Sequence, residues 1–307
     1  MTTNLENGGK FPPFSFAKVL QSSIMQLFKA SSYPYELVLS NKNKTNTPFP
    51  LLRNEIGCEK IWSVSPIHGR SFVIGKSNDG KWIVSKGNGL NYTSFCFVST
   101  GRSWQDSWGM LSKEHATRDF FIGNEIRELG IKTNEMEYVL ELEYDVMSPY
   151  TKKTIRPSLL QYRVECPYRI SDFAFMPQEE FQKQVNNWNK FNKKGFDKYH
   201  LIAANILIEN LRILHSHKIL HNGIHTQNYT WALELLDFEG SRTPTHPYDS
   251  AEYEALVLEL IDGEVNQTYE VINYIAWCLD EILDVKAVDK LFKENGFALN
   301  ELRLKVK

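Results

Sequence analysis

Four polar residues between positions 221 and 237 have the types and the spacing of a site for magnesium and a nucleotide. Asn228 follows His221 by seven residues, and Asp237 follows nine residues later. One amide and one carboxylate supply the oxygen ligands that Mg²⁺ takes when phosphates and water complete its shell. Gln227 can orient an attacking group, although an amide cannot accept a proton as a general base does. The alternative is a polar turn that precedes a buried strand, ELLDF.

The order of these residues is that of the protein-kinase loop. Kinases carry H-x-D-x-x-x-x-N followed by D-F-G, and the Asn and the later Asp hold magnesium against the phosphates. His221, Asn228 and Asp237 take those places, and Phe238 follows the aspartate. Gly223 stands where a kinase has its catalytic aspartate, so this position supplies no base.

A lysine at the end of a predicted strand supplies the other half of such a site. The stretch IVSKGNGLNY places Lys86 before two glycines, and the predicted helix HATRDFFIGNEIREL carries Asp119 and Glu125. In kinases a strand lysine contacts the phosphates and is held by a helix carboxylate. Asp119 is the favoured partner, and Glu125, nearly two turns on, is the longer alternative. Taken alone, Lys86 is typical of an exposed hairpin lysine; its position ahead of the matching loop favours the functional interpretation.

These motifs resemble those of the selenoprotein-O (SelO) pseudokinases, which are similar to kinases but bind ATP turned around and transfer AMP. The family has K-G-x-G-x-x-x-Y, then T-I-R-E-F and L-G-I-P-T, where this chain reads K-G-N-G-L-N-Y, T-R-D-F and L-G-I-K-T. The family loop H-G-V-x-N-T-D-N ends nine residues before D-Y-G, and H-N-G-I-H-T-Q-N ends nine residues before Asp237. The resemblance covers roughly residues 60–255 of a chain much shorter than typical family members.

The resemblance implies an ATP- and Mg²⁺-dependent adenylyltransferase that modifies Ser, Thr or Tyr hydroxyls of a protein substrate. In RVECPYRISDF, Arg163 and Arg169 match two family arginines that grip the β- and γ-phosphates of the inverted ATP. The arginine fork suits phosphate because it pairs two oxygens at once. Lys86 and Asp119 would position phosphates, and Asn228 and Asp237 would hold the metal. The alternative is an ordinary edge strand with solvated arginines.

The chain departs from the family at two positions of the site. Gln227 replaces the family aspartate that is thought to act as the base, and Glu239 replaces the glycine of D-Y-G. Asp172 and His225 are candidates for a substitute base. Glu239 is either an extra magnesium ligand or a partner of Arg242.

A second resemblance leaves the acceptor open. His225, Gln227, Asn228 and D-F-E-G at 237–240 also resemble the ATP-site signature of siderophore synthetases, which adenylate carboxylates. A small-molecule or peptide carboxylate is already ionised and needs no base. Two further alternatives are ordinary transfer of the γ-phosphate, which Gly223 and the two arginines disfavour, and a regulatory pseudokinase that binds a nucleotide or a partner protein with little catalysis.

Composition points to a globular cytoplasmic protein. The 307 residues are 42% hydrophobic, and a net charge of −2 provides no strong field for nucleic acid or an anionic membrane. No apolar run approaches the ~18–20 residues of a membrane span, and the N-terminus lacks a signal-peptide pattern. The cysteines lie far apart, which disfavours a zinc ribbon and a disulfide framework.

Hydrophobic periodicity predicts an α+β fold with the bilobal plan of protein kinases. Strands are expected at 61–66, 70–75, 81–86 and 138–144, with one helix at 113–129 among them. Helices are expected at 178–194, 197–217, 249–261, 267–284 and 286–294. Before these, residues 17–30 read as a short helix and 40–48 as a mobile loop or linker. We therefore expect an N-terminal extension (1–55), a strand-rich N-lobe (56–150) and a helical C-lobe (151–307), with the hinge near 146–160.

Overall fold

The computed structural model describes residues 26–53, 57–63, 70–89, 110–147, 154–247 and 253–297. Within these ranges, eight strands form one antiparallel sheet in the order β2-β7-β10-β6-β5-β4-β1-β3, and a short hairpin, β8-β9, stands apart. The strands are β1 Gln26–Ser32, β2 Tyr35–Ser40, β3 Leu51–Arg53, β4 Glu59–Ser63, β5 Ser71–Lys76, β6 Trp82–Lys86, β7 Glu135–Leu142, β8 Val146–Met147, β9 Thr154–Ile155 and β10 Ser158–Val164.

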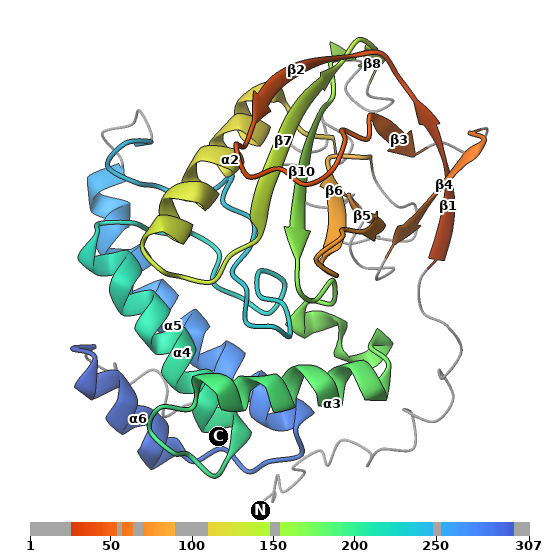
Figure 1. Cartoon of the computed structure of the whole chain (residues 1–307). Helices are drawn as coiled ribbons and strands as arrows, with labels where there is room; N and C mark the ends of the chain where they lie inside the picture. Colours follow the sequence, from red (N-terminus) through yellow and green to blue (C-terminus); the bar gives the residue numbers. More distant parts are fainter. Residues whose placement is uncertain are drawn as a thin grey trace, which may run out of the picture.

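The helices divide between two lobes (Figure 1). One helix, α2, lies along the sheet beside β7, and the others gather in a separate lobe beyond β10. They are α2 Lys113–Glu128, the 3₁₀ helix η3 Ile170–Phe175, α3 Gln178–Asn187, the 3₁₀ helix η4 Trp188–Phe191, α4 Tyr199–Ser216, α5 Tyr253–Cys278 and α6 Val285–Glu294. The α+β class with a strand-rich first lobe and a helical second lobe is thus confirmed. None of the helices among the described residues is both long and apolar enough to cross a membrane.

Helix α2 is placed against the sheet by its cap and its apolar face. The Ser112 hydroxyl accepts a hydrogen bond from the His115 amide (3.2 Å), which satisfies one of the free donors of the first turn. Ala116, Phe120 and Ile126 are buried on the side that packs against β7 and β10. Asp119 is buried as well, so this helix carries one carboxylate into the interior.

The register of β6 and β10 decides which side chains share a face of the sheet. Lys86 pairs with Leu160 and Ile83 pairs with Arg163. Paired residues share a face, so Lys86 and Leu160 lie on the same side. Successive side chains of a strand point to opposite faces, and Arg163 is three positions from Leu160 on β10. Lys86 and Arg163 therefore lie on opposite faces of the sheet.

The chain passes between the lobes later than expected. Strand β10 lies inside the sheet, between β7 and β6, and ends at Val164. The segment that joins the lobes is therefore 165–169, not 146–160, and the expected boundary at 150 falls before the last strand of the N-lobe. The RVECPYR stretch begins in a central strand rather than in an edge strand.

Part of the expected N-terminal extension belongs to the same sheet. Strands β1, β2 and β3 come from residues 26–53, and β1 pairs with both β4 and β3. Residues 26–30, the end of the predicted helix 17–30, are therefore strand; the remainder of that helix lies outside the described residues.

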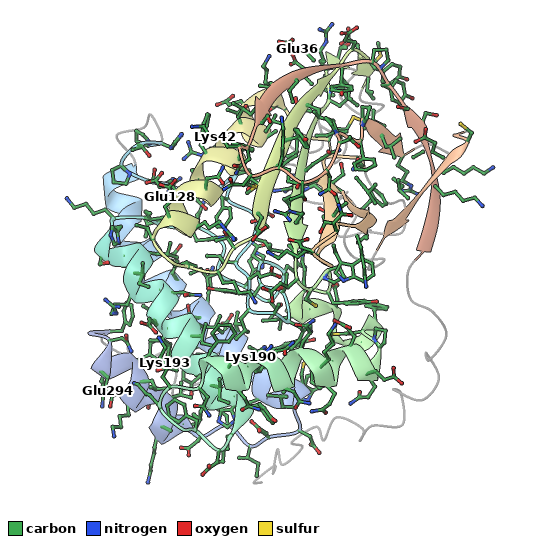
Figure 2. The ribbon with its side chains drawn as sticks, viewed as in Figure 1. Glu36, Lys42, Glu128, Lys190, Lys193 and Glu294 are labelled. Carbon is green, nitrogen blue, oxygen red and sulfur yellow. The ribbon has the colours of Figure 1, made fainter. Side chains whose placement is uncertain are left out.

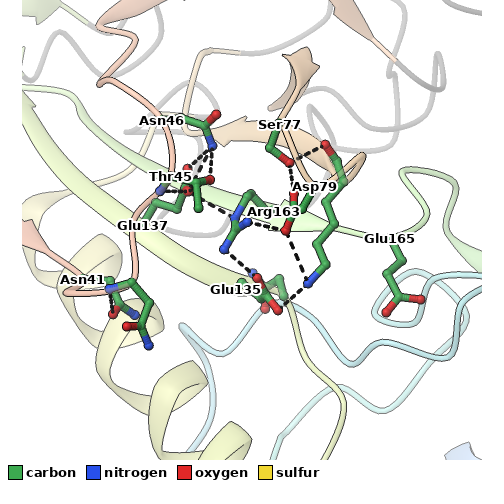
Figure 3. A network of polar contacts seen from close by, with 12 residues as sticks. Asn41, Thr45, Asn46, Ser77, Asp79, Glu135, Glu137, Arg163 and Glu165 are labelled. Atoms are coloured by element: carbon green, nitrogen blue, oxygen red, sulfur yellow. Dashed lines mark hydrogen bonds and ion pairs between the residues drawn. The ribbon is translucent and has the colours of Figure 1, made fainter.

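The polar 41–50 segment is held against the sheet, although we expected a mobile linker there. Its backbone donates from Asn41 to the Glu137 carbonyl (2.8 Å), and from Thr45 to the Glu137 carboxylate (3.0 Å). Asn46 binds the same carboxylate, and the Phe49 amide donates to Gln161 (3.1 Å). Figure 3 shows part of this network. The segment covers the face of the sheet that also carries Arg163.

Charged side chains lie on the outside of both lobes. Figure 2 labels Glu36, Lys42 and Glu128 on the sheet lobe and Lys190, Lys193 and Glu294 on the helical lobe, and all six are exposed. Inside the helical lobe, α4 is buried along most of its length and packs against α5 and α6. Where two helices were predicted at 249–261 and 267–284, α5 is a single helix.

Candidate functional site

Lys86 lies at the centre of a buried charge cluster. Its side chain is 2% exposed, and its Nζ atom is 2.6 Å from Asp119 Oδ2 and 2.5 Å from Asp237 Oδ1. Glu239 Oε2 is 3.4 Å away. Two residues predicted from separate motifs, one on α2 and one after the 221–228 loop, therefore meet at a single ammonium group.

A glycine is required directly after Lys86. Gly87 has a φ of +100°, and a Cβ atom at this position would lie 2.5 Å from the carbonyl oxygen of Ser158. The backbone can therefore turn at the end of β6 only without a side chain. This turn leaves Lys86 as the last residue of the strand, facing the cluster.

Asp119 is the helix carboxylate that holds the lysine. Besides Lys86, it accepts a hydrogen bond from the Phe238 amide (3.0 Å), which ties α2 to the residue after Asp237. Glu125 lies elsewhere: its carboxylate accepts hydrogen bonds from the hydroxyls of Thr243 (3.1 Å) and Thr245 (2.8 Å). The structure therefore does not bring Glu125, one of the expected nucleotide-binding residues, to the cluster, because it lies nearly two turns further along the helix.

The charges of the cluster perturb one another strongly. Burial opposes the charged form of Lys86, but Asp119, Asp237 and Glu239 together raise its pKa above the ordinary value. Burial likewise opposes ionisation of Asp237, but Lys86, Arg70 and Arg169 hold its pKa well below its usual range. Asp119 is the exception, because burial and the neighbouring carboxylates raise its pKa despite the contact with Lys86. Asp237 is thus the carboxylate that stays ionised most firmly.

The loop before Asp237 is built from short contacts among its own residues. The Leu236 amide donates to the Asn228 carbonyl (2.9 Å), so Asn228 lies beside the extended stretch before Asp237, which the structure forms in place of the expected strand. Its Nδ2 donates to the Gly223 carbonyl (2.9 Å), which leaves the amide oxygen as the acceptor atom. A Cβ atom at Gly223 would lie 3.1 Å from that nitrogen. Gly223 thus makes room for Asn228.

His221 holds the loop through a buried hydrogen bond. Its ring is 1% exposed, and Nε2 lies 2.9 Å from the Leu236 carbonyl. Burial lowers the pKa of His221, so the neutral ring donates this hydrogen bond. Asp237 itself has a φ of +70°, an uncommon conformation for a residue other than glycine.

Two side chains of α5, which the sequence did not single out, hold the same loop. Glu264 accepts a hydrogen bond from the Asn222 amide (2.6 Å), and Gln267 accepts one from the Ile224 amide (3.0 Å). Both face the loop from a helix that periodicity had divided in two. A lone Glu and Gln in a helix carry no signal of such a role.

Arg169 lies at the edge of the site. Its guanidinium donates to the Gln227 carbonyl (2.6 Å), and its charge contributes to the lowered pKa of Asp237. Its backbone amide donates to Asp172 (2.8 Å), which caps η3. Asp172, a candidate substitute base, thus has a structural role, whereas the other candidate, His225, is exposed. Gln227 is half-buried next to Asn228.

Arg163 is not part of the site, which corrects the expected pair of phosphate-binding arginines. It lies on the other face of β10, where its guanidinium is 2.6 Å from Asp79, 2.7 Å from Glu135 and 3.1 Å from Glu137 (Figure 3). Three carboxylates already surround this side chain, which is 7% exposed. The strand alternation of β10 explains the placement.

Arg70 takes part in the cluster and was not predicted. It precedes β5, pairs with Glu239 and lies 3.6 Å from Asp237. In the sequence it stands at the start of a predicted strand, where nothing distinguishes it from a solvated arginine. Glu239 thus faces the interior between Arg70 and Lys86.

A cleft between the lobes adjoins the cluster. Most of its lining is apolar or aromatic. Arg169 and Asp172 contribute the charged part of the wall. The lining residues are Ser71, Phe72, Val73, Val84, Tyr162, Val164, Cys166, Pro167, Arg169, Asp172, Thr230 and Leu236.

The donor set suits a hard divalent cation. Carboxylate oxygens of Asp119, Asp237 and Glu239 all lie within 4.8 Å of one another. Two cations, Lys86 and Arg70, face these three carboxylates, so the group carries one net negative charge with every member ionised. Oxygen donors of this kind are those that Mg²⁺ prefers.

Comparisons with known proteins give distant structural matches. No protein-family model matches the chain, and no curated protein matches its sequence. The chain is similar to a Stt7 homolog from Micromonas algae, whose crystal was soaked with ATP (11% identity, TM-score 0.42, 87% of this chain and 84% of that one). It is also similar to a rhoptry antigen kinase domain specific to Toxoplasma gondii (10% identity, TM-score 0.36, 91% and 82%). Similarity of this degree carries no argument about activity, and the kinase-like assignment rests on the bilobal element order and on the contacts among Lys86, Asp119 and Asp237.

Proposed function

We propose that this chain is a kinase-like transferase that binds Mg–ATP between its lobes and transfers AMP to a hydroxyl of a protein substrate. The observation that carries the proposal is the meeting of Asp119 and Asp237 at Lys86 Nζ, at 2.6 and 2.5 Å. A buried lysine with a helix carboxylate on one side and a loop carboxylate on the other is the arrangement that positions phosphates in kinase sites.

The residues present fit magnesium. Asp237, held ionised by its cationic neighbours, and the amide oxygen of Asn228 would hold the ion, with Glu239 close by. Bound Mg²⁺ would neutralise charge on the phosphates. Lys86 and Arg70, which face carboxylates, are two of the cations available to contact phosphate oxygens.

The loop supplies no general base at the usual position. Gly223 has no side chain, and Gln227 carries an amide. Loss of a base costs roughly 10²–10⁴-fold in rate, whereas positioning and charge stabilisation account for most of phosphoryl-type transfer. The proposed enzyme is therefore slow.

The transferred group depends on how ATP lies in the cleft. Transfer of AMP from an inverted nucleotide is supported by the SelO-like motifs and by Arg169 at the cleft wall. Arg163 lies on the other face of β10, so it does not support this transfer.

The apolar lining of the cleft favours a second candidate. Val84, Val164 and Leu236 suit a purine ring better than a phosphate chain. With the purine ring in the cleft and no catalytic carboxylate in the loop, the chain would bind the nucleotide as a regulatory module and would transfer little of it.

Radiolabelled ATP separates these possibilities. The purified protein is incubated with Mg²⁺ and ATP labelled at either the α- or the γ-phosphate, beside an Asp237→Asn variant. Protein-bound α-label without γ-label is the expected result, and the variant abolishes it. Protein-bound γ-label contradicts AMP transfer and indicates a kinase. Pyrophosphate release without labelled protein indicates a small-molecule or peptide carboxylate as acceptor, and nucleotide binding without turnover supports the regulatory candidate.

A further inference from the structure

The segment 241–247, which follows the D-F-E motif, is fastened to the outer face of α2. The Arg118 guanidinium donates to the carbonyl oxygens of Ser241 (3.2 Å from Nε) and His246 (2.6 Å). Glu125 accepts hydrogen bonds from the two threonine hydroxyls of the segment. The Phe121 ring stacks on His246, with ring centroids 5.9 Å apart. Arg118, Phe121 and Glu125 are three and four residues apart, so they form one face of the helix.

The same segment is tied to the 221–228 loop. The Ser241 hydroxyl donates to the His221 carbonyl (3.0 Å), and Arg242 and Leu220 exchange backbone hydrogen bonds (2.7 and 2.9 Å). Ser241 is fully buried. Through this one residue, α2 is connected to the loop that carries Asn228.

Arg118 and Asp119 are adjacent and reach the two ends of one short stretch. Asp119 binds Lys86 and the Phe238 amide, while Arg118 binds the Ser241 carbonyl three residues further along. A hydrogen bond from a charged donor contributes more than a neutral one. The guanidinium therefore adds a charge-assisted connection between α2 and the segment that follows Asp237.

We infer that Arg118 is a positioning residue whose contacts with segment 241–247 hold Asp119 against Lys86 and so prepare the site for the phosphates of the nucleotide. This inference rests on the proposed function, because its main test measures the affinity of the protein for Mg–ATP. Without the guanidinium, α2 keeps its apolar packing and the contacts of Asp119 and Glu125 but loses the two hydrogen bonds to the Ser241 and His246 carbonyls.

The test compares Arg118→Gln with Arg118→Lys, and uses Glu128→Gln as a matched control on the exposed side of α2 (Figure 2). Affinities for Mg–ATP and for adenosine are measured by calorimetry, and exchange of the Phe238 amide by mass spectrometry. We expect Arg118→Gln to weaken Mg–ATP by about 5- to 50-fold, within the range typical of coupling between sites. Adenosine binding stays the same, and the Phe238 amide exchanges faster while α4 keeps its protection. Arg118→Lys keeps part of the Mg–ATP affinity because the lysine reaches one carbonyl. Glu128→Gln changes neither the Mg–ATP affinity nor the exchange of the Phe238 amide.

A double-mutant cycle with Asp119→Asn identifies the route of the effect. If Arg118 acts through Asp119, adding Arg118→Gln to Asp119→Asn weakens Mg–ATP no further. Additive losses, or unchanged Mg–ATP affinity and Phe238 exchange in Arg118→Gln, overturn the inference. Equal losses for adenosine and ATP with general loss of amide protection show a purely structural role and overturn it as well. Failure of the unaltered protein to bind Mg–ATP refutes the proposed function instead, and faster Phe238 exchange in Arg118→Gln still detects the contact.

Discussion

The contacts of single residues account for the charge balance of the site. Lys86 is almost fully buried, and an isolated ammonium group in such a place would lose its proton. Three carboxylates keep it charged. Lys86 and Arg70 in turn lower the pKa of Asp237 and of Glu239, against the effect of burial.

Another buried carboxylate, Glu234, binds the segment between the lobes, and its shifted pKa predicts a pH dependence of stability. It accepts hydrogen bonds from the Glu165 amide (2.8 Å) and the Thr230 hydroxyl (2.8 Å), and a longer one from the Cys166 amide (3.4 Å). Burial raises the pKa of Glu234 to about 7, against the opposing effects of Lys132 and these hydrogen bonds.

Because the folded pKa lies above the unfolded value, this group stabilises the fold below pH ~4.5 and loses that contribution as the pH rises through ~7. The shift corresponds to about 3 kcal/mol. We expect the free energy of unfolding, measured in urea, to fall with rising pH. In the Glu234→Gln variant this decrease should be smaller by about 3 kcal/mol. At pH 5 the two proteins should be similar. An identical pH dependence in both would show that Glu234 does not titrate in this range.

At the scale of elements, the two faces of β10 have separate tasks. Tyr162 and Val164 line the cleft, whereas Gln161 and Arg163 bind the 41–50 segment and the carboxylates beneath it. This division predicts what happens when the buried guanidinium is removed.

The Arg163→Met variant should be less stable without losing nucleotide affinity. It leaves Asp79, Glu135 and the buried Glu137 without their common cation, and breaking a buried ion pair typically costs about 3–5 kcal/mol. Urea unfolding measures the loss, and Mg–ATP titration of the folded variant should match the unaltered protein within about 2-fold. Arg156→Met, which removes a 53% exposed guanidinium, is the control and should change stability by less than about 1 kcal/mol. A 10-fold weaker affinity for Mg–ATP in Arg163→Met would restore the paired-arginine interpretation.

Elements with strong local signals were predictable from the sequence, and those that depend on distant partners were not. Strands β5 and β6 and helix α2 appear where alternation, the SNDG turn and helical spacing placed them. Strands β1 to β3 were missed because short strands in a polar context take their stability from neighbours far along the chain, such as β7.

The candidate site shows the same division. Lys86, Asp119 and Asp237 come together as their motifs indicated: Lys86 ends β6, Asp119 lies on the buried face of α2, and Asp237 follows the 221–228 loop. Arg163 was misplaced because a motif match does not show which face of a strand a side chain occupies. Arg70 was missed because only the folded sheet brings the start of β5 over the D-F-E stretch.

At the scale of the whole molecule, the site is assembled from separate parts of the chain. Strand β6 supplies Lys86, the residue before β5 is Arg70, α2 supplies Asp119, and the segment between α4 and α5 supplies Asn228 and Asp237. The apolar cleft lies where the lobes meet, lined by β5, β6 and β10 on one side and by Leu236 on the other. Such an arrangement is complete only in the folded, bilobal protein.

Calorimetric titration of the protein with ATP, with and without Mg²⁺, tests the central claim most directly. It is performed on the unaltered chain, on Lys86→Met and Asp237→Asn, and on Lys76→Met as a control for an exposed lysine of the same sheet. We predict one Mg²⁺-dependent site that weakens by about 10-fold or more in Lys86→Met and Asp237→Asn, since each loses a hydrogen bond or ion pair with a charged group, and that is unchanged in Lys76→Met. Absence of binding to the unaltered chain, or equal affinity in Lys86→Met, would contradict the assignment of a nucleotide site to this cluster.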